Sequence, residues 1–131
     1  MTTQNGQQRM MNERQTAADN PRAPENLGRF AFIIPAYNHA ATVAQVARKA
    51  RDMGFPVFVV DDGSTDDTPQ RLAEIKNIQV LRHEKNEGKG AAIRTGFMAA
   101  SHVADYAITV DADGQHDPED ALGLSDAIPF I

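Results

Sequence analysis

The sequence contains no cysteine, little positive charge and no long apolar run. Without cysteine, the protein has neither disulfide bonds nor thiolate-ligated metal sites. Lysine and arginine number 13 against 18 acidic residues, and the net charge of −5 argues against nucleic-acid binding, which needs a basic surface. No apolar run approaches the ~20 residues of a membrane span, and the N-terminus has no apolar signal core. We therefore expect a cytoplasmic protein.

The remaining composition is that of one small globular domain with a tail. Hydrophobic residues make up 41% of the 131 residues and the mean hydropathy is −0.45, which fits a soluble chain with a modest core. Residues 1–28 are rich in glutamine, asparagine, threonine and proline. They cannot bury enough apolar surface to offset the entropy lost on ordering. We predict a disordered tail over residues 1–28 and one domain over residues 29–131.

Beyond the tail, apolar runs alternate with segments of helical spacing. Four runs are typical of strands buried on both faces: 30–34, 57–60, 78–81 and 107–110. Three segments have helical spacing: about 41–53, 69–76 and 91–100. A last helix is expected to start near Asp117 and to run toward Ile128, and Pro35 should end the first strand because it donates no ladder hydrogen bond. The alternation predicts an α/β fold, a Rossmann-like mostly parallel sheet with helices on both faces.

Three of the predicted strands end in polar residues that would gather at one edge of the sheet. These are Tyr37 and Asn38 after the first strand, Asp61 and Asp62 after the second, and Asp111 and Asp113 after the fourth. Ligands of open α/β sheets bind just beyond the carboxyl ends of the strands. Two carboxylates a few ångströms apart repel each other by about 1 kcal/mol in water and ~4 kcal/mol at an effective dielectric near 20. A divalent cation that bridges to an anionic ligand would relieve this repulsion, so the pattern predicts a metal–phosphate site.

Other polar residues have simpler explanations. Helix capping accounts for Asp66 and Asp67, because acids favour a helix N-terminus, but it does not account for the acids at the end of the second strand. His83 and His102 have no acidic partner in a motif, so we expect both at the surface. The stretch Asn86-Glu87-Gly88-Lys89-Gly90 precedes a predicted helix, where glycines let backbone N–H groups approach an anion. It matches neither the phosphate loop nor the dinucleotide fingerprint, and an ordinary glycine-rich turn is the alternative.

The stretches around these positions resemble the N-terminal half of family 2 glycosyltransferases, which have the GT-A fold. The stretches are, in order, FAFIIPAYNHAATV, VFVVDDGSTDDT, NEGKGAAIRTGF and ITVDADGQHDP. Within that family they are most similar to the polyprenyl-phosphate sugar transferases of the dolichol-phosphate mannose synthase type. The resemblance covers about residues 30–122, which is nearly all of the predicted domain.

The resemblance implies a nucleotide-diphospho-sugar donor and assigns roles to individual positions. Around the nucleotide and diphosphate it places Pro35, Ala36, Tyr37, Asn38, Asp62, Gly88, Lys89 and Gly90. To a divalent metal it assigns Asp111, Asp113 and Gln115. Oxygen ligands without cysteine or histidine favour Mg²⁺ or Mn²⁺ over Zn²⁺, and the metal would neutralise the departing diphosphate. The implied acceptor is a polyprenyl phosphate, which would bring the protein to the cytoplasmic face of the membrane.

Two departures from the family pattern affect these expectations. His39 stands where many members have glutamate, so recognition of the base or ribose is expected to differ. The family's second half, which carries the acceptor site and in many members the catalytic base, has no counterpart here, and no catalytic base is assigned. We therefore expect a truncated chain whose fourth strand has an exposed edge, which would favour dimerisation and low stability.

Three alternatives stay open from the sequence. The Asp-Ala-Asp-Gly run at 111–114 also resembles a phosphatase motif in which Asp111 is the nucleophile, although such a fold would need its motif nearer the domain start. A nucleotidyltransferase of related architecture would share the diphosphate–metal chemistry. A truncated, catalytically inactive fragment that at most binds nucleotide is the third, given how much sheet a stable domain of this class needs.

Overall fold

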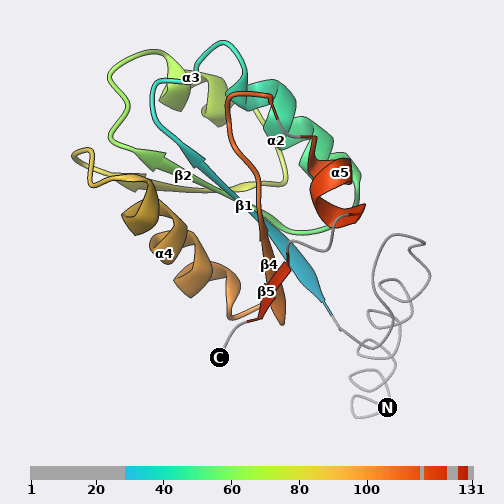
Figure 1. The fold of residues 1–131 in the computed structure, drawn as a ribbon. Coiled ribbons are helices and arrows are strands. Elements are labelled where there is room, and N and C mark those ends of the chain that lie inside the picture. Colours follow the sequence, from blue (N-terminus) through green and yellow to red (C-terminus); the bar gives the residue numbers. More distant parts are fainter. Residues whose placement is uncertain (1–28, 116, 124–126, 130–131) are drawn as a thin grey trace, which may run out of the picture.

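The computed structural model describes residues 29–115, 117–123 and 127–129, and the tail predicted over residues 1–28 lies outside this part of the chain (Figure 1). The strands are β1 (Phe30–Ala36), β2 (Val57–Asp62), β3 (Gln79–His83), β4 (Tyr106–Thr109) and β5 (Ala127–Pro129). The helices are α2 (Val43–Asp52), α3 (Thr68–Ala73), α4 (Lys89–Ala100) and α5 (Pro118–Gly123). The strands form one sheet in the order β3-β2-β1-β4-β5. β1 to β4 are mutually parallel and β5 is antiparallel to β4, which confirms the mostly parallel α/β sheet.

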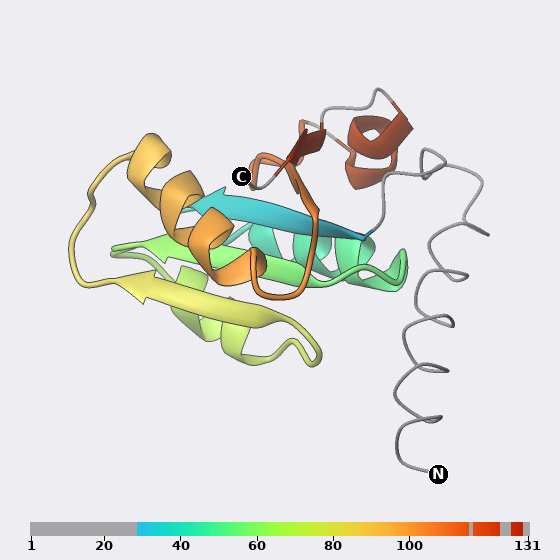
Figure 2. The same ribbon diagram turned by 90° about the horizontal axis from the view of Figure 1, so that it is seen from below.

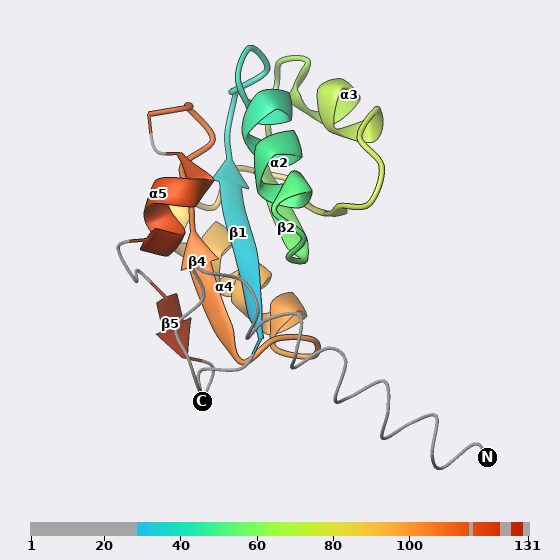
Figure 3. The ribbon, with the colours of Figure 1, turned by 90° about the vertical axis from the view of Figure 1, so that its right-hand side faces the viewer.

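Helices cover both faces of this sheet. In Figure 3, α2, α3 and α5 lie in front of the strands, whereas Figure 2, from another side, shows α4 across the opposite face. Every residue of the central strand β1 is buried. Successive side chains of a strand point to opposite faces, so Phe32 and Ile34 join the cluster beneath α2 and α3, and Ala31 and Ile33 join the cluster beneath α4. This double burial explains why the strand is an unbroken apolar run.

The expectation that Pro35 ends the first strand is wrong, because β1 continues through Pro35 to Ala36. Pro35 is paired with Val60 of β2, and its missing N–H would lie on the other side of β1, toward β4. On that side Ile33 accepts the N–H of Val110 (3.0 Å), and β4 has ended by then at Thr109. The sheet therefore loses at most one terminal ladder bond to the proline.

The C-terminal part of the described chain also differs from expectation. Ile128, predicted in a helix, lies in β5, whereas α5 spans Pro118–Gly123. β5 pairs with β4 from Tyr106↔Pro129 to Ile108↔Ala127, so the expectation that β4 has an exposed edge is wrong. Dimerisation itself stays a prediction. Two smaller boundaries move as well: α3 ends at Ala73, two residues before the buried Ile75, and β3 runs to His83.

No helix among the residues that the structure describes is both long and apolar enough to cross a membrane.

Candidate functional site

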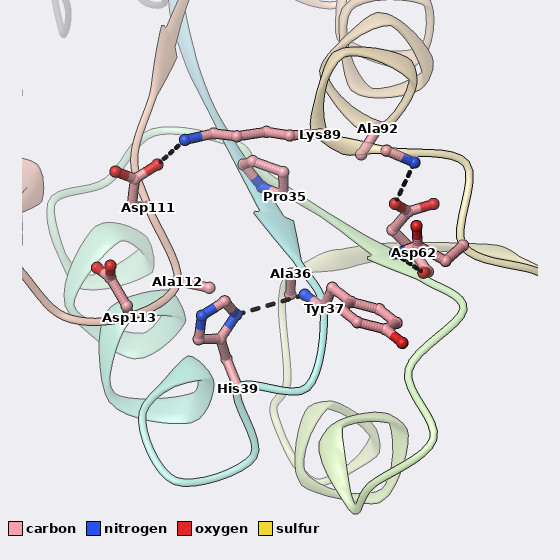
Figure 4. A pocket seen from close by; sticks show the side chains of 12 residues that line it. Pro35, Ala36, Tyr37, His39, Asp62, Lys89, Ala92, Asp111, Ala112 and Asp113 are labelled. Carbon is pink, nitrogen blue, oxygen red and sulfur yellow. Dashed lines mark hydrogen bonds and ion pairs between the residues drawn. The ribbon is translucent and has the colours of Figure 1, made fainter.

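A cavity of about 410 Å³ lies at the carboxyl ends of β1, β2 and β4 (Figure 4). It is lined by Pro35, Ala36, Tyr37, His39, Asp62, Asn86, Gly88, Lys89, Ala92, Asp111, Ala112 and Asp113. These residues come from four segments: the end of β1 with its following loop, the end of β2, the start of α4 with the preceding loop, and the turn after β4. The structure therefore gathers most of the predicted site residues in one place. Asn38, Gly90 and Gln115 are not among the lining residues.

Asn38 joins the loop after β1 to the loop after β2. Its backbone has a positive φ of 56°, and its N–H donates to Ser64 Oγ (2.9 Å). Its amide oxygen accepts the N–H groups of Thr65 (2.8 Å) and Asp66 (3.2 Å). These bonds hold the loop that carries the neighbouring Tyr37, a residue that lines the cavity and is 42% exposed. The predicted contact between Asn38 and a nucleotide stays a prediction.

Asp66 is the second link between the same two loops. It accepts the N–H of Thr68 at the start of α3 (2.9 Å) and the N–H of Ala40 (3.1 Å). Burial acts to raise the pKa of Asp66, but hydrogen bonds from the hydroxyl and N–H of Thr68 and from Ala40 outweigh it, so the pKa is lowered. The helix-start role predicted for Asp66 is confirmed. Asp67 occupies the N-cap position of α3, without a side-chain capping bond.

Asp61 has a structural part rather than a place in the cavity lining. It is fully buried, accepts the N–H of Ser64 (3.0 Å) and forms an ion pair with Arg82 of β3. The same guanidinium donates to the carbonyl oxygen of Ser64 (3.1 Å). The pair thus stabilises the turn that follows β2.

Asp62 is the buried acid of the cavity, with 2% of its surface exposed. Its Oδ1 accepts the N–H of Glu87 (2.9 Å) and lies 2.7 Å from His83 Nδ1, and its Oδ2 accepts the N–H of Gly88 (2.8 Å). Burial acts to raise the pKa of Asp62, but the hydrogen bonds from Glu87, His83 and Gly88, together with the charge of His83, lower it below the ordinary 3.8. Asp62 is therefore ionised at neutral pH, and it holds the loop that leads into α4.

His83 is the residue that sequence reasoning missed. Its side chain is only 11% exposed, so the predicted surface position is wrong, whereas His102 is exposed as expected. His83 stands directly opposite Asp62 in the parallel register of β2 and β3. Its other ring nitrogen lies 2.8 Å from Thr95 Oγ1 of α4. No local motif predicts this contact. It could have been predicted only from the pairing of the two strands, because one ends in an acid and its neighbour ends in a histidine.

The turn after β4 carries the more exposed acids. Asp111 Oδ1 lies 2.6 Å from Lys89 Nζ, and these side chains are 31% and 62% exposed. Asp113 accepts the N–H of Gln115 (3.0 Å). The hydroxyl of Thr42, just before α2, donates to the carbonyl oxygen of Ala112 (2.6 Å), which anchors the turn between the two acids. Figure 4 shows both acids beside the cavity, with Lys89 reaching across to Asp111.

The donor set of this turn matches one class of metal site. No group of three or more acidic, histidine or cysteine side chains within the described residues is arranged to hold a metal ion. Two carboxylates are nonetheless the usual protein share of a Mg²⁺ site, because Mg²⁺ keeps several waters and takes substrate phosphate oxygens as its remaining ligands. Asp111 and Asp113 therefore fit a cation that arrives with a phosphate ligand and do not form a complete cage.

Known proteins are similar to this chain in sequence and in fold. Residues 31–128 match the family model described as Glycosyl transferase family 2. The UDP-N-acetylglucosamine–dolichyl-phosphate N-acetylglucosaminyltransferase of Methanococcus voltae is 34% identical over 107 residues, which cover 68% of this chain and 43% of that protein. The dolichol-phosphate mannosyltransferase of Pyrococcus furiosus is 32% identical over 103 residues, which cover 73% of this chain and 29% of that protein.

Among solved structures, S. aureus TarS superposes with a TM-score of 0.60 at 25% identity, covering 74% of this chain and 31% of that one. The chain spans less than half the length of each of these relatives.

Proposed function

The chain belongs to glycosyl transferase family 2, a family of enzymes with the GT-A fold, and from this premise we propose that its cavity binds the nucleotide diphosphate of a nucleotide-diphospho-sugar donor. We propose further that the sugar is transferred to a polyprenyl phosphate. The names of the M. voltae and P. furiosus relatives, which mention dolichyl phosphate and dolichol phosphate, support this acceptor class. Such an acceptor would bring the protein to the cytoplasmic face of a membrane.

The observation that carries the proposal is the convergence of Tyr37, Asp62, Lys89, Asp111 and Asp113 on one cavity. They come from segments that are far apart in the sequence and that meet at the carboxyl edge of a parallel sheet, where open α/β sheets bind ligands. The volume of about 410 Å³ lies within the range of small-molecule sites. The lining offers an aromatic face, an ionised acceptor and a cation, which are the groups that a nucleoside diphosphate needs.

Each group has a distinct part in this proposal. The exposed ring of Tyr37 stacks on the base, and the carboxylate of Asp62 accepts a hydrogen bond from the base or ribose. The ammonium group of Lys89 attracts the diphosphate, assisted by the N–H groups at the glycine-flanked start of α4. Pro35, Ala36, Asn38, Gly88 and Gly90 shape the backbone around the nucleotide.

Asp111 and Asp113, with Gln115, are the residues that we propose to hold Mg²⁺ or Mn²⁺. When bound, such a cation would supply positive charge to the diphosphate as it leaves the sugar. Lys89 lies within hydrogen-bond distance of Asp111 and offsets part of its negative charge in the same region. An acceptor phosphate is already anionic, so transfer to it needs no general base, and we assign none.

Calorimetric titration of the chain with UDP and with GDP, with and without Mn²⁺, tests the proposal. We expect one nucleotide to bind in a Mn²⁺-dependent manner, and Asp111→Ala and Asp113→Ala each to weaken binding by at least about tenfold, equivalent to ~1.4 kcal/mol. The matched control is Asp52→Ala, which removes an exposed acid of α2 and should bind like the parent chain. If the parent chain is folded by circular dichroism and binds neither nucleotide, the proposal fails and the inert-fragment alternative is favoured.

A further inference from the structure

A continuous set of hydrogen bonds joins Asp62, His83 and Thr95, which lie on β2, β3 and α4. Asp62 Oδ1 and His83 Nδ1 are 2.7 Å apart, and His83 Nε2 and Thr95 Oγ1 are 2.8 Å apart. The Asp62 and His83 side chains are 3% and 11% exposed. The carboxylate of Glu87 lies 3.5 Å from His83 Nδ1, and the Glu87 side chain is 56% exposed. Asp62 is therefore the main partner of His83 Nδ1.

The direction of the bond between His83 and Asp62 follows from the chemistry of the groups. An ionised carboxylate only accepts hydrogen bonds, so His83 Nδ1 carries a proton and donates to Asp62. His83 Nε2 faces the hydroxyl of Thr95, which can donate to a bare ring nitrogen or accept from a protonated one. In both cases Thr95 holds the ring in the orientation that places Nδ1 against Asp62.

The hydrogen bonds to Asp62 occupy the acceptor sites of its two oxygens to different extents. Each carboxylate oxygen offers about two acceptor sites. Oδ1 takes the His83 ring and the N–H of Glu87, which uses both sites. Oδ2 takes the N–H of Gly88 from the described residues and keeps one site for a further donor. Asp62 lines the cavity, and in the proposed function this remaining site accepts a ligand N–H or O–H.

We infer that His83 is a positioning residue for nucleotide recognition: together with Thr95 it holds the Asp62 carboxylate in the orientation that presents Oδ2 to the ligand. The inference deepens the proposed function and rests on it. The terminal torsion of an aspartate side chain is broad, so the carboxylate turns easily unless partners hold it. Without His83, a ligand would have to order the carboxylate on binding, which lowers affinity.

Nucleotide affinity of four variants tests this inference. The titrations use the chain with Mn²⁺ and whichever of UDP or GDP binds. We expect His83→Leu to weaken binding about tenfold, and His83→Asn, whose amide N–H stands near the place of Nδ1–H, to stay within about threefold of the parent. Thr95→Val should fall between them, because the ring keeps Asp62 as a partner. The control His102→Leu removes an exposed histidine and should leave affinity unchanged.

A spectroscopic measurement on the unaltered chain keeps the inference falsifiable if His83→Leu does not fold. The ¹⁵N shifts of the His83 ring should indicate a protonated Nδ1, and the Nδ1 resonance should move when nucleotide is added, because the ligand bonds the carboxylate that Nδ1 contacts. A neutral ring protonated only at Nε2 would overturn the inference.

The outcomes distinguish nucleotide binding by the cavity from the positioning role of His83. If the parent chain binds no nucleotide, the proposed function and the inference fail together. If the parent binds and a folded His83→Leu binds equally well, the inference fails while the proposed function stands.

Discussion

The cavity has two acidic sides that differ in how the protein satisfies their charge. On the Asp62 side, the carboxylate is nearly fully buried and receives hydrogen bonds from His83, Glu87 and Gly88. On the Asp111 side, Asp111 is about one-third exposed and pairs with a largely exposed Lys89, while Asp113 accepts the N–H of Gln115. One side is organised by the protein itself, and the other presents its charge to the solvent and to any ligand.

Because of this difference, the two sides suit different roles in ligand binding. Hydrogen bonds to an ionised group contribute about 1.5–3 kcal/mol, so folding positions Asp62 firmly. An exposed ion pair such as Lys89–Asp111 is worth ~0–1 kcal/mol, so a metal or a diphosphate can replace it at little cost. The Asp62 side is suited to recognition by fixed geometry, and the Asp111 side is suited to exchange of charged partners.

Replacing one glycine on each side with alanine should give the largest difference in stability between the two sides. Gly63 has φ +74°, and a Cβ there would lie 2.5 Å from the backbone of Lys85 and Asn86; Gly114 has φ +80° but only Thr42 at 3.9 Å. Positive φ costs about 1–2 kcal/mol for alanine and overpacking adds ~1–3 kcal/mol. In urea denaturation, Gly63→Ala should therefore lose ~3 kcal/mol or more of unfolding free energy, against about 1–2 kcal/mol for Gly114→Ala. Equal losses would contradict the tight packing on the Asp62 side.

Acid should weaken the fold through the Asp62 side. The pKa of Asp62 is lowered by folding, so its contribution to stability is fully present above the ordinary pKa of 3.8 and is lost as the pH falls through the lowered value. The unfolding free energy of the parent chain should therefore decrease when the pH is lowered below ~4. At neutral pH the parent chain should be roughly 2 kcal/mol more stable than Asp62→Asn, and this difference should become smaller over the same pH range. Urea unfolding at stepwise lower pH measures both. A difference that stays constant would show that ionised Asp62 does not stabilise the fold.

The smallest effect is expected at the anchor of the Asp111 side. Thr42→Val removes the hydroxyl that donates to Ala112 and keeps a side chain of similar shape. Unfolding free energy should drop by about 1 kcal/mol, and nucleotide affinity with Mn²⁺ should fall roughly threefold because the turn between the two acids is held less firmly. Calorimetry with and without Mn²⁺ separates these effects, since affinity without the metal should change less. Unchanged Mn²⁺-dependent affinity would show that the anchor has no part in metal binding.

The sequence predicted the local elements well and their exact ends less well. An unbroken apolar run such as 57–60 is typical of a strand buried on both faces, and the structure has β2 there. The helical spacing of apolar residues correctly predicted α2 and α4. The errors lie where a short element depends on a neighbour. β5 has only three residues and exists by pairing with β4, and Pro35 is tolerated because of which side of β1 its nitrogen would face.

The candidate site divides in the same way. The sequence by itself determined which acids end the strands and that these ends meet at one edge, because parallel strands bring their carboxyl ends together. Only the tertiary structure decided the partners: His83 for Asp62, Lys89 for Asp111, and the loop after β2 for Asn38. Each of these pairs spans at least 21 positions in the chain, and its contact depends on strand register and helix placement. Local propensity and periodicity carry no information about such distant contacts.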